Sequence, residues 1–150
     1  MPDSHDLAAR VAEYFEKIER TVFRGDPAAN TKLRVEVLDQ ELVDDTPTLV
    51  LITPWTLNGM AFPPDDRFPE ELTLGKRRYP VFRNVLDGIG TYFSVNLVND
   101  VGNLTSPSAA RSVAHPLGRM FREAVARARD QRTVADQERR DLLRGGGASG

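Results

Sequence analysis

The sequence predicts an α+β domain: an N-terminal helix, a central antiparallel sheet of about four to five strands, and a long C-terminal helix, with the helices packed on one sheet face. Two patterns in the 150 residues support this fold class. Apolar residues recur every three to four positions near both ends of the chain, which is the period of an amphipathic helix. Between these ends, apolar and polar residues alternate in short runs separated by turn formers, which is typical of antiparallel strands.

The first helix comes before residue 25. Its apolar stripe consists of Leu7, Val11, Tyr14, Phe15, Ile18 and Val22. Asp3 or Ser4 can cap the N-terminus by accepting a hydrogen bond from a free backbone N–H group. Gly25-Asp26-Pro27 ends the helix, because proline disfavours helical backbone in the residue before it.

The strands are expected in the middle of the chain. Alternation is clearest in two runs, Leu33, Val35 and Val37, and then Phe93, Val95 and Leu97. Residues 48–53 are apolar on both faces, which predicts a central strand. Residues 76–82 form a further predicted strand, in which Pro80 favours an edge or a bulge. Asp44-Asp45-Thr46-Pro47 is a predicted turn.

The second long helix begins after the turn formers at 99–106. Ser106 can cap it, and Pro107 suits the first helical position. Its apolar stripe is Val113, Leu117, Met120, Phe121, Val125 and Ala128. Pro116 lies inside this pattern and is expected to kink or split the helix. We expect a single domain at 1–131 and a charged C-terminal tail at 132–150 that ends in a flexible Gly-rich segment.

The bulk composition excludes several classes of function. The formal charge is −2, from 20 basic and 22 acidic residues, so no strong field gathers nucleic acid or an anionic membrane. The absence of cysteine excludes disulfides, thiolate nucleophiles and zinc–thiolate sites. The N-terminus is polar, unlike a secretory signal, and no apolar run is long enough to span a bilayer. The expected compartment is therefore the cytoplasm.

Candidate catalytic residues are few. Asp65 and Asp66 are adjacent carboxylates without a nearby histidine, which is typical of an exposed loop. His115 precedes a proline, and a lone histidine there is more often a surface or capping residue than a general base. A small hydrolase that uses His115 or Asp65 and Asp66 stays an alternative. Metal sites need clustered ligands, and the sequence shows no such cluster, so we expect no metal. We also expect no catalytic residue and no cofactor.

The segment 52–64 departs from a simple strand pattern. It holds the only tryptophan, Trp55, followed by Leu57, Met60 and Phe62, between prolines. Trp, Met and Phe are enriched in the cores of protein interfaces, and Met adapts to varied apolar partners. The same side chains can instead fill the core of the domain itself. Composition alone leaves both interpretations open.

This segment, I-T-P-W-T-L-N-G-M-A-F-P-P, resembles the HybE family of [NiFe]-hydrogenase assembly chaperones. Members of that family carry I-T-P-W-x-L/M-N and a hydrophobic stretch that ends in F/L-P. The resemblance continues at 74–77, which is similar to the family's G-x-K-R, and at 87–92, which is similar to its D/E-G-x-G-x-Y. It covers roughly 7–145, including a C-terminal helix at 109–128 and a tail similar to R-R-x-F/L-L-x-G.

The chain departs from the family pattern at two places. At 95–100 it has Val-Asn-Leu-Val-Asn-Asp where many members have Cys-Ser-Leu-x-Ser-Pro, so any role of that cysteine does not carry over. Thr56 stands where many relatives have an aromatic or apolar residue. These differences bear on the client rather than on the family.

The resemblance implies a cytoplasmic chaperone of hydrogenase precursors. Members are implicated in holding the small subunit, which carries a twin-arginine export signal, or its complex with the large subunit, during maturation before export or final assembly. We expect residues 49–54 to build the sheet and 55–62 to face the client. The expected partner-binding residues are Pro54, Trp55, Leu57, Asn58, Met60 and Phe62. A permanent small accessory subunit of a larger complex is the alternative.

The C-terminal tail contains a second motif. Arg139, Arg140, Leu142 and Leu143 are similar to the R-R-x-hydrophobic-L core of a twin-arginine signal. Because such signals act at N-termini, this copy cannot direct export. We hypothesise that it mimics the client's signal and occupies the same groove when no client is bound. The alternative is a solvated charged helix.

Overall fold

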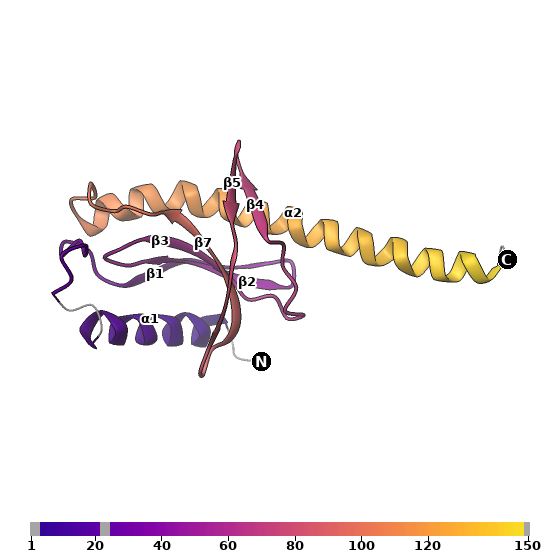
Figure 1. The fold of residues 1–150 in the computed structure, drawn as a ribbon, viewed down its shortest axis with the longest axis horizontal. Coiled ribbons are helices and arrows are strands. Elements are labelled where there is room, and N and C mark those ends of the chain that lie inside the picture. The colour runs from indigo at the N-terminus through magenta and orange to yellow at the C-terminus, as the bar shows by residue number, and fades with distance from the viewer. Residues whose placement is uncertain (1–3, 22–24, 149–150) are drawn as a thin grey trace.

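The computed structural model describes the backbone of residues 4–21 and 25–148, and their side chains except at 4–6, 132–136 and 143–148. Two helices, α1 (Ser4–Thr21) and α2 (Pro107–Ala148), stand at the two ends of the chain (Figure 1). The strands between them are β1 Glu36–Val43, β2 Thr46–Ile52, β3 Leu57–Ala61, β4 Glu71–Leu74, β5 Arg77–Pro80, β6 Phe82–Leu86 and β7 Gly90–Val98. Asp3 and Val22, which were assigned to the first helix, lie outside the described residues.

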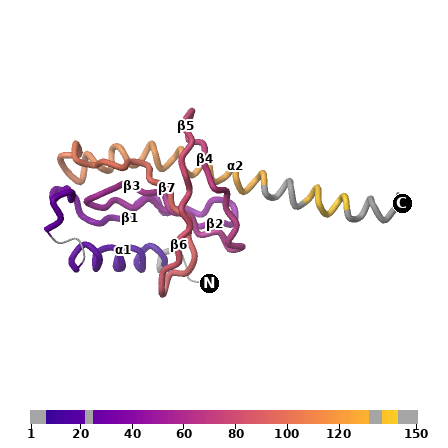
Figure 2. The backbone as a smooth tube through the Cα atoms, viewed as in Figure 1, coloured from indigo at the N-terminus to yellow at the C-terminus, as the bar shows by residue number. Residues whose placement is uncertain are grey.

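Five strands form one antiparallel sheet in the order β1-β2-β3-β7-β6. β4 and β5 form a separate hairpin that rises from the sheet beside α2 (Figure 2). The predicted α+β class, with an N-terminal helix, an antiparallel sheet and a long C-terminal helix, is therefore confirmed. The predicted strand at 76–82 corresponds to β5 and the start of β6, with Pro80 at the end of β5.

The two helices cover opposite faces of the sheet, so the expectation that both pack on one face was wrong (Figure 1). α2 packs on the face that carries Val50 and Ile52. α1 packs on the face that carries Leu49 and Leu51. Because β2 is apolar on both sides, each side needs its own cover. The pattern that predicted a central strand thus also required a helix on each face.

At two glycines, the face under α2 has no room for an additional atom. The ring of Phe121 lies directly on Gly59, where an added Cβ atom would stand 2.7 Å from the ring Cγ. A Cβ atom on Gly118 of α2 would stand 2.9 Å from Cγ2 of Val50. Protein interiors are close-packed, and carbon atoms do not approach one another this closely. The two glycines therefore allow the close approach of helix and sheet.

α2 is one continuous helix, and Pro116 does not split it as the sequence analysis allowed. A proline removes one backbone hydrogen bond and crowds the preceding turn. Ala114 and Gly118, on either side of Pro116, are buried against the sheet, and this packing offsets the cost. The helix also crosses the expected boundary between residues 131 and 132 and extends far beyond the sheet (Figure 1). The division into 1–131 and 132–150 stays a prediction.

A buried arginine attaches α2 to two loops. Arg129 is only 6% exposed, and its Nη2 and Nη1 atoms lie 2.7 Å and 3.1 Å from carboxylate oxygens of Asp45 and Asp65. Its Nη1 atom also donates a hydrogen bond to the backbone carbonyl of Arg67. Hydrogen bonding from Arg129 lowers the pKa of Asp45 below its usual value. The helix is thereby fixed to the β1–β2 turn and to the loop between β3 and β4.

Candidate functional site

The turn between β2 and β3 is built around the side chain of Thr53. Its Oγ1 atom accepts hydrogen bonds from the backbone N–H groups of Trp55 and Thr56, at 3.1 Å and 3.0 Å. The backbone N–H of Thr53 also donates to the carbonyl of Thr56, at 3.0 Å. Such local bonds hold a chain in a tight turn. Trp55 is therefore presented from a fixed position.

A second loop packs against this turn. The backbone N–H of Asn30 donates to the carbonyl of Pro54, at 2.8 Å. The side-chain amide of Asn30 donates to the carbonyls of Val101 and Leu104, at 2.8 Å each. Asn30 thus joins three segments that are far apart in sequence. They are the loop after α1, the β2–β3 turn and the loop before α2.

A cavity of about 610 Å³ lies between the end of α1, the loop at 25–35 and the β2–β3 turn. Its apolar lining includes Leu33, Val35 and Pro54, which are buried, and Trp55, which is half-buried. We call this cavity the Trp55 pocket. Its volume is in the range of pockets that bind small ligands.

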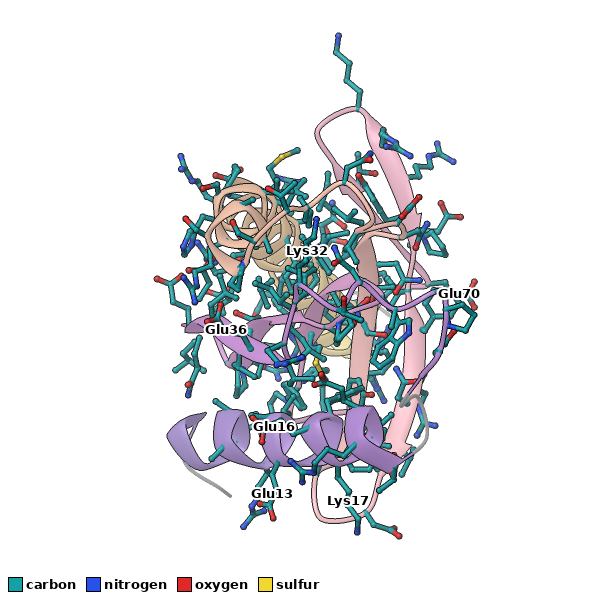
Figure 3. All side chains as sticks on the ribbon, turned by 90° about the vertical axis from the view of Figure 1, so that its left-hand side faces the viewer. Glu13, Glu16, Lys17, Lys32, Glu36 and Glu70 are labelled. Carbon is teal, nitrogen blue, oxygen red and sulfur yellow. The ribbon has the colours of Figure 1, made fainter. Side chains whose placement is uncertain are left out.

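The charged lining of the Trp55 pocket comes mainly from α1. The charged residues are Glu16, Glu19, Arg20, Asp26 and Arg34. Glu16 lies on the side of α1 that faces the sheet, whereas Glu13 and Lys17 point away from it (Figure 3). Arg34 forms an ion pair with Glu19, with 3.7 Å between Nη1 and Oε1. Three carboxylates and two guanidinium groups give the lining an excess of negative charge.

The structure brings two of the six predicted partner-binding residues, Pro54 and Trp55, into this pocket. Asn58, which follows Trp55 by three residues, is half-buried, and its Nδ2 atom donates a hydrogen bond to Oγ1 of Thr56 at 2.9 Å. The Asn58 Oδ1 atom is buried and has no hydrogen-bond partner among the described residues. Asn58 therefore supports the turn that carries Trp55.

Leu57, Met60 and Phe62 do not face solvent, and the expectation that residues 55–62 form an exposed surface was wrong for them. They are 0%, 1% and 7% exposed. Leu57 belongs to the core under α2, and Met60 and Phe62 belong to the core under α1. The physical reason is that β3 lies in the middle of the sheet, between β2 and β7, where both faces are covered. The sequence had left this interpretation open, and it holds for these three residues.

Sequence reasoning missed the α1 side of the pocket and the loop that contains Asn30. One signal could have found part of it. Glu36 pairs with Ile52, so the residues just before β1 lie beside those just after β2. Counting outward from the predicted turn at 44–47 therefore places Leu33 and Val35 near Trp55. The contribution of α1 depends on tertiary packing, which no local pattern in the sequence indicates.

Two of the three residues considered for catalysis, Asp65 and His115, have structural partners. Asp65 pairs with Arg129, and the Nδ1 atom of His115 lies 2.9 Å and 3.0 Å from the two carboxylate oxygens of Asp39. The latter contact joins α2 to β1. Asp66 is exposed in the β3–β4 loop. Within the described side chains, no group of three or more His, Cys, Asp or Glu residues is placed to hold a metal ion.

The tail motif lies far from the Trp55 pocket. Arg139, Arg140 and Leu142 are exposed on the part of α2 that extends beyond the sheet, and Leu142 is 74% exposed. The side chain of Leu143 is outside the described residues. The C-terminal end of α2 and the loop at 25–35 lie at opposite ends of the molecule (Figure 1). In this structure the tail is a helix and does not occupy the pocket.

The structure is that of a small α+β domain with a pocket between its first helix and the β2–β3 turn. The chain belongs to the family described as [NiFe]-hydrogenase assembly, chaperone, HybE, whose model matches residues 6–145. It is therefore an assembly chaperone of [NiFe]-hydrogenases, and the family resemblance of the sequence is confirmed. Comparisons with curated proteins and with solved structures gave no match. In the described part of the chain, no helix has the length and apolar character needed to cross a membrane.

Proposed function

We propose that this chaperone works in the cytoplasm, where it binds the precursor of the hydrogenase small subunit with its twin-arginine signal, alone or in complex with the large subunit. It holds this client during maturation and releases it before export or final assembly. The observation that carries the proposal is the Trp55 pocket, in which a tryptophan on a fixed turn stands beside an excess of carboxylates. The proposed work is binding and timing rather than catalysis.

The chemistry of the Trp55 pocket suits a segment that combines basic and apolar residues. An arginine can lie over the face of a tryptophan ring and at the same time pair with a carboxylate. Trp55 and Glu16 supply these two groups. Ala29 and Trp55, which are partly exposed in the lining, offer apolar surface to a neighbouring aliphatic side chain. A twin-arginine signal, with two arginines followed by apolar residues, contains both kinds of group.

The test is capture of the client from cells that produce the hydrogenase. Tagged wild-type protein is expected to capture unprocessed small subunit, identified by mass spectrometry of its N-terminus. Trp55→Ala is expected to capture at least about tenfold less, since tryptophans dominate the binding energy of many interfaces. Leu42→Ala is the matched control, because Leu42 is 65% exposed on β1 and lies outside the pocket. Capture of mature, processed complex instead would favour the alternative, a permanent accessory subunit.

The tail motif adds a second proposal, that Arg139, Arg140, Leu142 and Leu143 compete with the client's signal. In the structure this segment is helical and distant from the pocket, so competition requires it to unwind or to reach a second molecule. Deletion of residues 136–150 is expected to raise the affinity for a synthetic twin-arginine signal peptide. The control is Arg139→Lys with Arg140→Lys, which keeps the charge. Unchanged affinity after the deletion contradicts the mimic and leaves a solvated helix.

A further inference from the structure

The Trp55 pocket already contains one contact between a guanidinium group and a carboxylate, and both groups belong to the chain itself. The Nη1 atom of Arg34 lies 3.7 Å from the Oε1 atom of Glu19, and both residues line the pocket. This distance is that of an ion pair, but it is longer than a hydrogen bond from nitrogen to oxygen, which is about 2.9 Å. Arg34 therefore places a positive charge near Glu19 without donating a hydrogen bond to it.

The two partners of this ion pair differ in their exposure to solvent. The side chain of Arg34 is 76% exposed, whereas that of Glu19 is 21% exposed. An ion pair with one partner largely in solvent contributes little to stability, so Arg34 can leave Glu19 at little cost. A sheltered carboxylate gains more from a guanidinium group that also donates hydrogen bonds to it. The contact is therefore one that a better-placed guanidinium group can replace.

The backbone of Arg34 is fixed, although its side chain is exposed. Its neighbours Leu33 and Val35 are buried, Leu33 in the core under α2 and Val35 in the core under α1. The backbone N–H of Leu33 donates to the carbonyl of Asn30 at 3.0 Å, and Asn30 is bonded in turn to the β2–β3 turn. An Arg34 side chain that leaves Glu19 thus stays close to it and can return when the site is empty.

A second carboxylate of the pocket has no such partner. Glu16 and Glu19 are three residues apart on α1, so they lie on the same side of the helix, with about 5–6 Å between their Cβ atoms. Among the described side chains, none forms an ion pair with Glu16. The remaining carboxylate, Asp26, accepts a hydrogen bond from the backbone N–H of Ala28 at 2.9 Å and so supports its own loop. The pocket therefore offers one open carboxylate, and one that the chain's own arginine covers.

We propose that Glu19 is a second guanidinium site, which Arg34 occupies in the free chaperone and the second arginine of the client's signal occupies in the complex. This inference rests on the function proposed above, in which one arginine of the client pairs with Glu16. The client's guanidinium group donates paired hydrogen bonds to Glu19, and the side chain of Arg34 turns into solvent. When the client leaves, Arg34 returns. Because Arg34 competes with the client, it lowers the affinity and eases release.

The test uses a fluorescent peptide capped at both ends, Ser-Arg-Arg-Ala-Leu-Leu, and measures its binding to the full chain by anisotropy. Arg34→Ala removes the competitor and is expected to raise the affinity about threefold, the size of a weak exposed ion pair. Arg20→Ala is the matched control. It removes another exposed cation from the same lining, one that forms no ion pair with a described residue. Because an exposed charge is screened at physiological ionic strength, this variant is expected to bind like wild type.

A second pair of variants tests whether Arg34 acts through Glu19. Glu19→Gln is expected to weaken binding of the peptide, and adding Arg34→Ala to Glu19→Gln is expected to bring no gain. A peptide with one arginine, Ser-Arg-Gln-Ala-Leu-Leu, needs only Glu16, so Arg34→Ala is expected to leave its affinity unchanged. If Arg34→Ala raises the affinity equally with and without the Glu19 carboxylate, Arg34 acts through its charge alone and the proposal is overturned.

A third peptide, Ser-Gln-Gln-Ala-Leu-Leu, separates this inference from the proposed function. If wild type binds it as well as the peptide with two arginines, the proposed function fails, and the second guanidinium site fails with it. If wild type prefers the two arginines but Arg34→Ala brings no gain, only the second site is refuted. The nitrogen resonance of the Arg34 side chain in an NMR spectrum gives a direct measurement. It is expected to shift on saturation with the two-arginine peptide and not with the one-arginine peptide, and equal shifts would contradict the exchange.

Discussion

The two faces of the sheet differ in how tightly their helices are packed. Under α2, the ring of Phe121 touches the backbone of Gly59, and Arg129 secures the helix to two loops. Under α1, the core around Val11 and Met60 gives way at the end of the helix to the Trp55 pocket, with charged groups in its lining. Both faces have a buried core, and at the end of α1 the core gives way to a pocket with room for a ligand. A domain of 150 residues can combine both, because each face has its own core.

The largest expected effect is from Gly59→Ala on the α2 face. The added methyl group would meet the Phe121 ring at 2.7 Å, and Phe121 is fully buried. We expect a loss of about 3 kcal/mol in the free energy of unfolding, as for severe overpacking. Chemical denaturation measures this loss.

The matched control is Ala29→Leu, which adds a larger group to the lining of the Trp55 pocket. Because this cavity has room, we expect a change within about 0.5 kcal/mol. If the two substitutions cost the same, the two faces do not differ in packing.

Arg129→Met is expected to have the next largest effect. It leaves Asp45 and Asp65 without their buried partner, but both carboxylates are partly exposed. We therefore expect a loss of about 2 kcal/mol, below the 3–5 kcal/mol typical of a fully buried pair. Arg111→Met, which removes the exposed pair with Glu36, is expected to match wild type within error.

The effect of Arg129→Met also has a predicted pH dependence. The pKa of Asp45 is lowered by Arg129 in the folded state. The contribution of this pair is therefore present above the usual pKa of the carboxyl group, 3.8, and is lost as the pH falls below it. Denaturation at pH 7 and pH 3 is expected to show a smaller difference between Arg129→Met and wild type at pH 3. An equal difference at both values contradicts the assignment to the ion pair.

Trp55→Ala is expected to change binding more than stability. Trp55 is half-buried, and the hydrogen bonds of its turn come from the backbone and from Thr53. We expect a loss of about 1 kcal/mol or less in the free energy of unfolding. Thr53→Val, which removes the hydroxyl that holds the turn, is expected to weaken client capture as well. Full capture by Thr53→Val would show that the fixed position of Trp55 is not needed.

The smallest effect at neutral pH is expected from Tyr92→Phe on the α1 face. Burial raises the pKa of Tyr92 to about 12, and its ring lies 5.5 Å from that of Phe62. The unfolded chain ionises near pH 10, so wild type loses stability as the pH rises from 10 to 12. The loss is about 1.4 kcal/mol per pH unit in this range. Tyr92→Phe is expected to remove it, and an unchanged alkaline transition would contradict the burial of this hydroxyl.

The sequence predicted the fold class well because the periodic signals are strong at both ends and in β2 and β7. It did not predict the placement of α1, because an amphipathic stripe shows that a helix is buried but not against which face. The unbroken course of α2 through Pro116 was missed for a related reason. Local rules state the cost of a proline, whereas the packing of Ala114 and Gly118 that offsets it is tertiary.

The candidate site was predicted only in part. Pro54 and Trp55, which were predicted to bind a partner, line the pocket, and their role in binding stays a prediction. Met60 and Phe62 were assigned to the surface, because interface cores and protein cores share the same residue types. The apolar residues on both sides of β3, as in β2, are the feature that distinguishes a core strand from an interface surface. Glu16 lines the pocket only because of the way in which α1 packs on the sheet.

The Thr53 turn has a consequence for how such a chaperone can change over time. The hydrogen bonds that Thr53 and Asn30 make to hold the turn join the Thr53 hydroxyl and backbone atoms, and the indole of Trp55 takes no part in these bonds. A different side chain at position 55 would therefore alter what the pocket accepts while leaving the turn in place. Recognition and folding are encoded by different atoms of the same few residues, so a lineage can follow a changing client by single substitutions without first losing its structure.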